Sequence, residues 1–154
     1  MNIQKKQSEC LVFSTVQKTP FAKKQIAHMA SFVLQKLNVK GSLSVHCIGD
    51  TRMHTLNYHY RGKDRTTDVL SFAAEEGEKF SFVGDRELGD IFISVPQIRR
   101  QARGLHISEQ EEFCRMLVHG ILHILGHDHD RPSRAARMFG IQEDLLSIIL
   151  RNTH

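Results

Sequence analysis

Four histidines fall within the eleven residues His119–His129, and three of them have the spacing of a metal site. His119 and His123 are four residues apart, so a helix would place both imidazoles on one face, one turn apart. Two imidazoles held in this way can bind one ion at the usual Zn–N distance of about 2.0–2.1 Å. Gly126 stands where such a helix would end, and a turn there would bring His129 back to the same ion. The pattern His-x-x-x-His-x-x-Gly-x-x-His therefore predicts a zinc site made by His119, His123 and His129.

The alternatives at this site concern the metal and the neighbouring side chains. Core histidines can also be satisfied by hydrogen bonds alone, but three at this spacing favour a metal, and imidazoles also accept nickel, copper or iron. His127 is close enough in sequence to bind in place of His129; otherwise it lines the pocket or orients a neighbour. Asp128 and Asp130 are candidates for a carboxylate that holds a ligand imidazole, or they are simply solvated loop residues.

Gly120 limits the reaction class. In HExxH proteases this position carries the glutamate that takes a proton from the metal-bound water. Glycine has no such group, and inside a helix it costs about 1 kcal/mol relative to alanine. Close approach of a substrate or of a neighbouring element would explain its presence. Peptide hydrolysis by the usual mechanism is therefore not expected, although three protein ligands leave a fourth position open, as in catalytic zinc sites.

Hydrophobic periodicity predicts the elements that position these residues. Strand patterns occur at Cys10–Ser14, Ser42–Ile48, Asp68–Phe72 and Leu88–Val95. Helical patterns run from a Thr19-Pro20 cap to Leu37, from a cap at Asp50 to Tyr60, from Pro96 to Arg103 with Gly104 as the stop, from Glu109 to about Leu125 behind a Ser108–Glu111 capping box, and onward from Pro132. No crossover helix is visible between the last two strands, which favours their antiparallel pairing. The predicted fold class is α/β (α+β): a small mixed sheet of about four strands, with one antiparallel pair and about five helices packed on it.

Length and composition set the broad class. The 154 residues, 40% hydrophobic and 25% charged, are typical of one folded domain, which we interpret as a single metal-dependent hydrolase domain over residues 1–154. No apolar run approaches the roughly 20 residues that span a bilayer, and no signal peptide is visible. The three widely spaced cysteines argue against a disulfide framework and favour a reducing compartment, so we expect a cytoplasmic protein.

Basic residues are unevenly distributed along the chain. The net charge of +4 is compatible with a polyanionic substrate. Basic side chains gather at Lys18–Lys40, Arg61–Arg65, Arg99–Arg103 and Arg131–Arg137. Solvated helix faces explain most such clusters, so charge alone does not establish a nucleic-acid partner.

Three segments together resemble a known family, the YbeY-type ribosomal RNA maturation factors. They are YRGKDRTTDVLSF (Tyr60–Phe72), LGDIFIS (Leu88–Ser94) and HGILHILGHDH (His119–His129). The resemblance implies a mixed α/β fold, zinc held by the three histidines of the motif, and a requirement for Arg61 in activity. The family pattern often has tyrosine where this chain has His127.

Arg61 fits that role chemically, because a guanidinium can bind phosphate oxygens in bidentate fashion as lysine cannot. Its alternative role is that of a surface arginine in the turn before Gly62. Zinc and arginine together would supply the positive charge that a phosphodiester needs on its developing oxyanion. Lys63 and Arg65 extend the same basic turn and are candidates for contacts with the RNA backbone, or are merely solvated.

Two strand residues complete the candidate site. Ser71 alternates onto the face opposite Leu70 and Phe72, so it is a candidate for substrate contact, with strand packing as the alternative. Asp90 begins an otherwise apolar strand and is a candidate catalytic residue that orients a metal-bound water or a ligand imidazole; its alternative role is to cap the strand end.

The resemblance implies a zinc-dependent, single-strand-specific endoribonuclease, and the three-histidine spacing, Gly120 and the turn at Arg61 agree with it. The resemblance implies action in ribosomal RNA maturation, including processing of the 16S rRNA 3′ end, and in ribosome quality control. The implied partners are single-stranded RNA, ribosomal RNA and the small ribosomal subunit, with no membrane. Two alternatives remain: a ribosome-assembly factor with structural zinc, and a non-nuclease metallohydrolase such as a peptidase.

Overall fold

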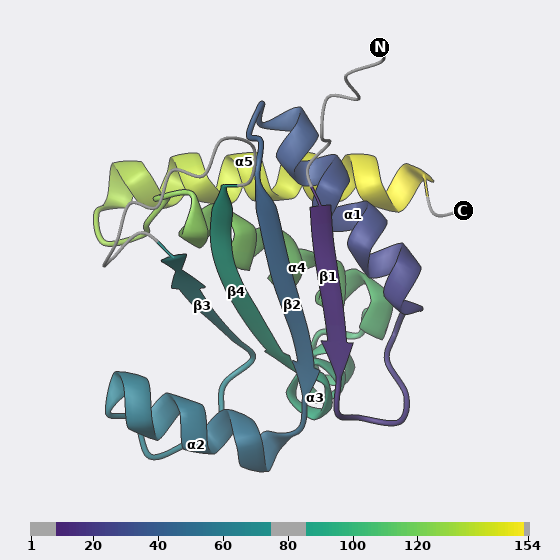
Figure 1. Ribbon diagram of the computed structural model, residues 1–154, viewed down its shortest axis with the longest axis vertical. Helices are drawn as coiled ribbons and strands as arrows, with labels where there is room; N and C mark the ends of the chain where they lie inside the picture. Colours follow the sequence, from purple (N-terminus) through teal and green to yellow (C-terminus); the bar gives the residue numbers. More distant parts are fainter. Residues whose placement is uncertain (1–8, 75–85, 153–154) are drawn as a thin grey trace.

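A four-stranded sheet lies against a layer of helices in the computed structural model of the chain, which describes residues 9–74 and 86–152 (Figure 1). The strands are β1 (Glu9–Ser14), β2 (Ser42–Ile48), β3 (Val69–Ala73) and β4 (Glu87–Ser94), in the order β1-β2-β4-β3. The β1–β2 and β2–β4 pairs are parallel, and β3 pairs antiparallel with β4. The predicted mixed sheet with one antiparallel pair is confirmed.

Five helices accompany the sheet within the described residues: α1 (Lys23–Lys36), α2 (Asp50–Arg61), α3 (Val95–Leu105), α4 (Glu109–Ile124) and α5 (Pro132–Asn152). Figure 1 shows α1, α4 and α5 together behind the sheet, whereas α2 lies apart from them at the lower end of the strands. None of the helices in the described parts of the chain is long and apolar enough to span a membrane.

Successive residues of β3 and β4 face two different hydrophobic clusters, because side chains alternate across a sheet. On the helix side, Ile91 and Ile93 of β4 join the main core with apolar residues of α1, α4 and α5. On the other side, Phe92 packs near a smaller cluster that contains Leu70 of β3 and Met53 of α2. This alternation decides which side chains of the sheet can reach α4, the helix that carries the histidines.

Three predicted helix ends are wrong: the starts of α1 and α2 and the end of α3. Helix α1 begins at Lys23 rather than behind Thr19-Pro20. The Thr19 hydroxyl donates to the carbonyl of Phe21, while the Gln25 side-chain oxygen accepts from the Ala22 N–H at 2.8 Å. Helix α3 continues through Gly104 to Leu105 and ends at His106, which adopts a left-handed φ of 57°.

Asp50 is the first residue of α2, and Gly49 occupies the cap position that was predicted for Asp50. The Asp50 carboxylate instead accepts hydrogen bonds from Ser94, Thr66 and Arg100, so it joins the start of α2 to the loop before β3 and to the start of α3. The connection between β3 and β4, predicted to lack a crossover helix, falls largely at residues 75–85, outside the described residues.

Candidate metal centre

Helix α4 and the turn after it position the three histidines. The Ser108 hydroxyl accepts from the Glu111 N–H at 3.0 Å, so the predicted cap at the start of α4 is confirmed. At the other end, Gly126 has a φ of 92° and its N–H donates to the carbonyl of His123 at 3.0 Å. The left-handed turn at Gly126 reverses the chain and returns His129 to the face of α4, as the sequence predicted.

The imidazoles of His119, His123 and His129 converge. Each offers a nitrogen atom, and these atoms all lie within 4.8 Å of one another. The Nε2 atoms of His119 and His123 are 3.0 Å apart. His127 is not part of this group; it lines a neighbouring cleft.

Gln142 of α5 holds one of these rings in place and is not among the residues predicted for the site. Its Oε1 lies 2.7 Å from Nδ1 of His119, so it can accept from an Nδ1–H and leave Nε2 of His119 free for a metal. Gln142 is only 3% exposed and lies in the apolar stripe of α5 with Met138, Leu145 and Ile149. An amide within an apolar helical stripe is the sequence signal that could have found it.

Neither Asp128 nor Asp130, the candidates for a carboxylate that holds a ligand imidazole, makes such a contact within the described residues. The Asp128 carboxylate pairs with Arg134 at 3.2 Å and accepts from the backbone N–H of Asp130 at 3.3 Å. The orienting partner of a ligand imidazole is therefore an amide from α5 and not a carboxylate from the loop.

The three histidines fit a divalent metal. Burial, reinforced by the charges of His119 and His129, lowers the pKa of His123 to about 4. The neutral imidazole, which is the form that binds metal, is therefore favoured at neutral pH. Three imidazoles that converge, with one ring fixed through its second nitrogen, match the donor set of zinc sites that keep an open position.

Gly120 lies where α4 touches the sheet. A Cβ at this position would meet Cγ2 of Ile91 at 3.0 Å and Oγ of Ser71 at 3.1 Å. The Ser71 hydroxyl also donates to the Gly120 carbonyl at 3.0 Å. Glycine is therefore explained by the close approach of a neighbouring element, and the glutamate of an HExxH protease would not fit here.

Arg61 lies at the end of α2, beside the outer edge of β3. Gly62 caps the helix with a φ of 69°. Nη2 of Arg61 donates to the Ser71 carbonyl at 3.0 Å, and the guanidinium carbon lies 4.9 Å from the centre of the Phe72 ring. Ser71 thus contacts Arg61 through its carbonyl and α4 through its hydroxyl, so the hydroxyl predicted to touch substrate is already bonded to Gly120.

Comparison with known proteins identifies the family. A family model described as endoribonuclease YbeY matches residues 2–149. The chain belongs to the YbeY family. A protein from Persephonella marina named endoribonuclease YbeY is 37% identical over 130 residues, which cover 82% of this chain and 83% of that protein. Another of that name, from Oenococcus oeni, is 40% identical over 126 residues, 80% of this chain and 81% of the relative.

The fold is also shared with a solved structure. The solution structure of TM1509 from Thermotoga maritima superposes with a TM-score of 0.66 at 21% sequence identity, covering 93% of this chain and 90% of that chain. The family model and the two named relatives confirm the YbeY resemblance drawn from the three motifs, and the solved structure confirms the fold.

Two further basic residues of the YbeY motif lie in the turn after Gly62. Lys63 and Arg65 are both exposed, and the Arg65 carbonyl accepts from the side-chain amide of Asn57 at 2.8 Å. The turn is thus held through its backbone while both cationic side chains face solvent. Their contact with RNA stays a prediction.

Asp90 of the YbeY motif lies away from the histidines. It shares a face of β4 with Phe92, whereas Ile91 points the other way, toward Gly120 on α4. Its Oδ1 atom is 2.9 Å from Nε2 of His46 on β2. Strand alternation therefore separates Asp90 from the candidate metal centre, and the predicted contact with a metal-bound water or ligand imidazole is not made.

Proposed function

We propose that this chain is a zinc-dependent, single-strand-specific endoribonuclease of ribosomal RNA maturation. The proposal includes processing of the 16S rRNA 3′ end, ribosome quality control, association with the small ribosomal subunit and a cytoplasmic location. The observation that carries it is a three-histidine centre connected to Arg61 through Ser71, in a chain of the endoribonuclease YbeY family.

His119, His123 and His129 would hold the zinc ion, with Gln142 fixing the tautomer and ring orientation of His119. When bound, zinc supplies Lewis-acid stabilisation of negative charge on a phosphate oxygen. Every other contribution belongs to side chains of the protein.

Arg61 is the side chain best placed to bind the scissile phosphate. One guanidinium nitrogen is held by the Ser71 carbonyl and the plane is supported by the Phe72 ring, which leaves the remaining N–H groups for phosphate oxygens. A guanidinium fixed before substrate arrives loses little entropy on binding and is preorganised for the charge of the transition state. Lys63 and Arg65 extend the positive surface along the same turn.

Two features disfavour the alternatives, a zinc peptidase and a protein with purely structural zinc. The packing at Gly120 leaves no room for the glutamate of a zinc peptidase. His129 is exposed and the site lies at the molecular surface, whereas a purely structural zinc site is closed by four protein ligands.

The test compares wild type, His123→Ala, Arg61→Ala and, as a control, Arg151→Ala. Zinc content is measured by mass spectrometry, folding by circular dichroism, and activity by cleavage of a defined single-stranded RNA and of its duplex. We expect His123→Ala to lose zinc and cleavage, and Arg61→Ala to keep zinc and fold but lose cleavage. Arg151 is an exposed arginine near the end of α5, so its substitution should leave all three readouts unchanged.

If both His123→Ala and Arg61→Ala cleave as wild type does, the activity is a contaminant and the proposal fails. If Arg61→Ala supports normal ribosome maturation while His123→Ala unfolds, the chain is instead an assembly factor with structural zinc.

A further inference from the structure

A cleft lies directly beside the candidate metal centre. Its walls are Gly126, His127 and Asp128 on one side and Arg134 and Arg137 of α5 on the other. The first three residues belong to the segment that links the histidines of α4 to His129. A nucleotide chain bound at the histidines would therefore pass this cleft.

The cleft is cationic. Arg134 pairs with Asp128 at 3.2 Å, which fixes its guanidinium at the wall. Arg137 is exposed and has no carboxylate partner within the described residues. The segment Gly126–Arg137 contains three arginines and two aspartates, so its formal charge is positive even with the histidines left out. A group with negative charge, presenting several oxygen acceptors, complements such a surface.

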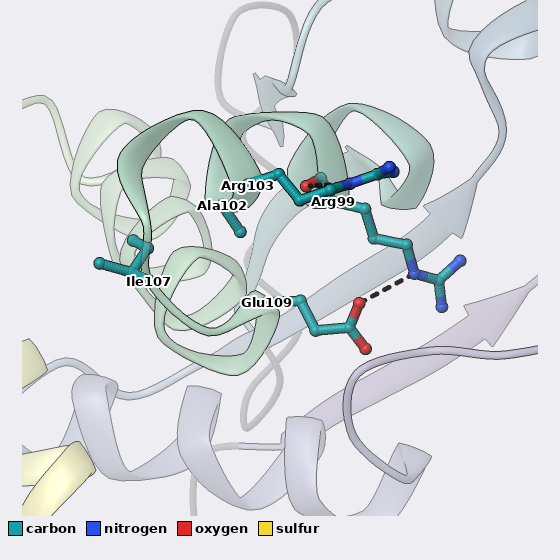
Figure 2. Close-up of a pocket in the computed structure, with 5 residues that line it drawn as sticks. All are labelled: Arg99, Ala102, Arg103, Ile107 and Glu109. Carbon is teal, nitrogen blue, oxygen red and sulfur yellow. Dashed lines mark hydrogen bonds and ion pairs between the residues drawn. The ribbon is translucent and has the colours of Figure 1, made fainter.

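A second cavity lies between α3 and the start of α4, and it likewise combines one paired arginine with a second, exposed one. It is lined by Arg99, Ala102, Arg103, Ile107 and Glu109 (Figure 2). Arg99 bonds Glu109 at 3.0 Å and the Lys18 carbonyl at 3.0 Å, so its charge is compensated inside the protein. This cavity also contains no part of the histidine site. It therefore provides a matched control for charge substitutions.

We propose that the Arg134–Arg137 cleft binds a phosphodiester of single-stranded RNA that flanks the phosphate at the metal centre, with Arg137 as its main contact. The inference rests on the proposed function in one respect, since it takes RNA as the ligand of the histidine site. It adds a substrate-binding subsite formed by the basic segment Arg131–Arg137, which lies outside the three motifs shared with the YbeY family.

The test measures binding of a fluorescein-labelled single-stranded RNA of about ten nucleotides by fluorescence anisotropy at several salt concentrations. The proteins are the full chain, Arg137→Gln, Arg137→Lys and the control Arg103→Gln, and the RNA is checked for integrity after each titration. Arg137→Gln should weaken binding about threefold and reduce the slope of log K against log salt by about 0.7, the value for one lost phosphate contact. Arg137→Lys should keep most of the slope, and Arg103→Gln should match wild type.

A second measurement locates the contact along the RNA. Single linkages are replaced by uncharged methylphosphonates, and one replacement should weaken binding to wild type but not to Arg137→Gln. Equal effects of Arg137→Gln and Arg103→Gln, or no linkage with this pattern, overturn the inference.

The same titrations separate the inference from the proposed function. If the wild-type chain cleaves RNA but binding does not depend on Arg137, the proposed subsite is overturned and the proposed nuclease function stands. If binding depends on Arg137 but the wild-type chain does not cleave RNA, the proposed subsite is supported and the proposed nuclease function is overturned. A chain that neither binds nor cleaves overturns both.

Discussion

Ser71 and Gly120 are joined by a hydrogen bond of 3.0 Å from the serine hydroxyl to the glycine carbonyl. The bond connects β3, at the edge of the sheet, to the helix turn between the two histidines of α4. Because the Ser71 carbonyl also accepts from Arg61, one residue couples the position of the arginine to that of the metal ligands. The absence of a side chain at Gly120 is what permits the approach.

Gly120→Ala should therefore destabilise the fold although alanine favours helices. The new methyl group would lie 3.0–3.3 Å from Ile91, Ser71 and Val69. Two of these side chains are β-branched, have limited freedom to move and belong to paired strands. Overpacking of this kind typically costs about 1–3 kcal/mol, and alanine recovers about 1 kcal/mol of helix propensity. We expect a net loss of about 1 kcal/mol in the free energy of unfolding, measured by urea denaturation.

Gly140→Ala is the matched control. Gly140 lies within α5 and a Cβ there would meet no atom within 4 Å. This substitution should raise the free energy of unfolding by about 0.5–1 kcal/mol. Equal effects at the two glycines would show that the contact between α4 and the sheet is looser than the structure has it.

The sequence predicted the strands, the helices and the histidine centre well because each depends on local spacing. The i, i+4 pair, the helix stop at Gly126 and the strand alternation are all visible within a few residues. The surroundings of Asp50 and Asp90 instead depend on distant partners. The local pattern predicts a cap at Asp50, but Thr66, Ser94 and Arg100, which lie 16, 44 and 50 positions further along the chain, donate hydrogen bonds to its carboxylate. The local pattern of β4 does not show which of its faces meets α4, and that face decides whether Asp90 lies near the histidines.

Gln142→Leu should weaken zinc binding without unfolding the protein. Leucine has a similar volume and suits the apolar stripe of α5, but it cannot accept the Nδ1–H of His119. Loss of a group that orients a ligand imidazole typically costs about 10–100-fold in metal affinity. Affinity is measured by competition with a chromophoric chelator, with Gln35→Leu on the exposed side of α1 as control. Wild-type affinity in Gln142→Leu would show that His119 needs no orienting partner.

Asp90→Asn should leave zinc affinity unchanged, in contrast to Gln142→Leu. The side chain of Asp90 lies on the sheet face opposite α4 and pairs with His46 at 2.9 Å. Asparagine can still accept from His46, so the local structure should persist. The same chelator competition checks this, and a loss of zinc affinity would mean that Asp90 reaches the metal after all.

Asp50→Ala should destabilise the protein by about 1–3 kcal/mol, because it removes one acceptor shared by several donors. The carboxylate accepts two bonds from Arg100 at 2.8 Å, one from Ser94 at 2.9 Å and one from Thr66 at 3.1 Å. The bonds from Arg100 in particular lower the pKa of Asp50. Without the Asp50 carboxylate, the hydroxyl of the fully buried Ser94 loses its acceptor, and the start of α2 is released from α3.

The readouts for Asp50→Ala are urea denaturation and RNA cleavage, with the exposed Asp144→Ala on α5 as control. Zinc affinity should be unchanged, since the histidines are held by α4 and α5. Cleavage should fall, because α2 carries Arg61 at its other end and a loosened helix no longer holds the guanidinium at the edge of β3. A destabilised variant that cleaves at the wild-type rate would show that Arg61 is positioned by Ser71 and Phe72 alone.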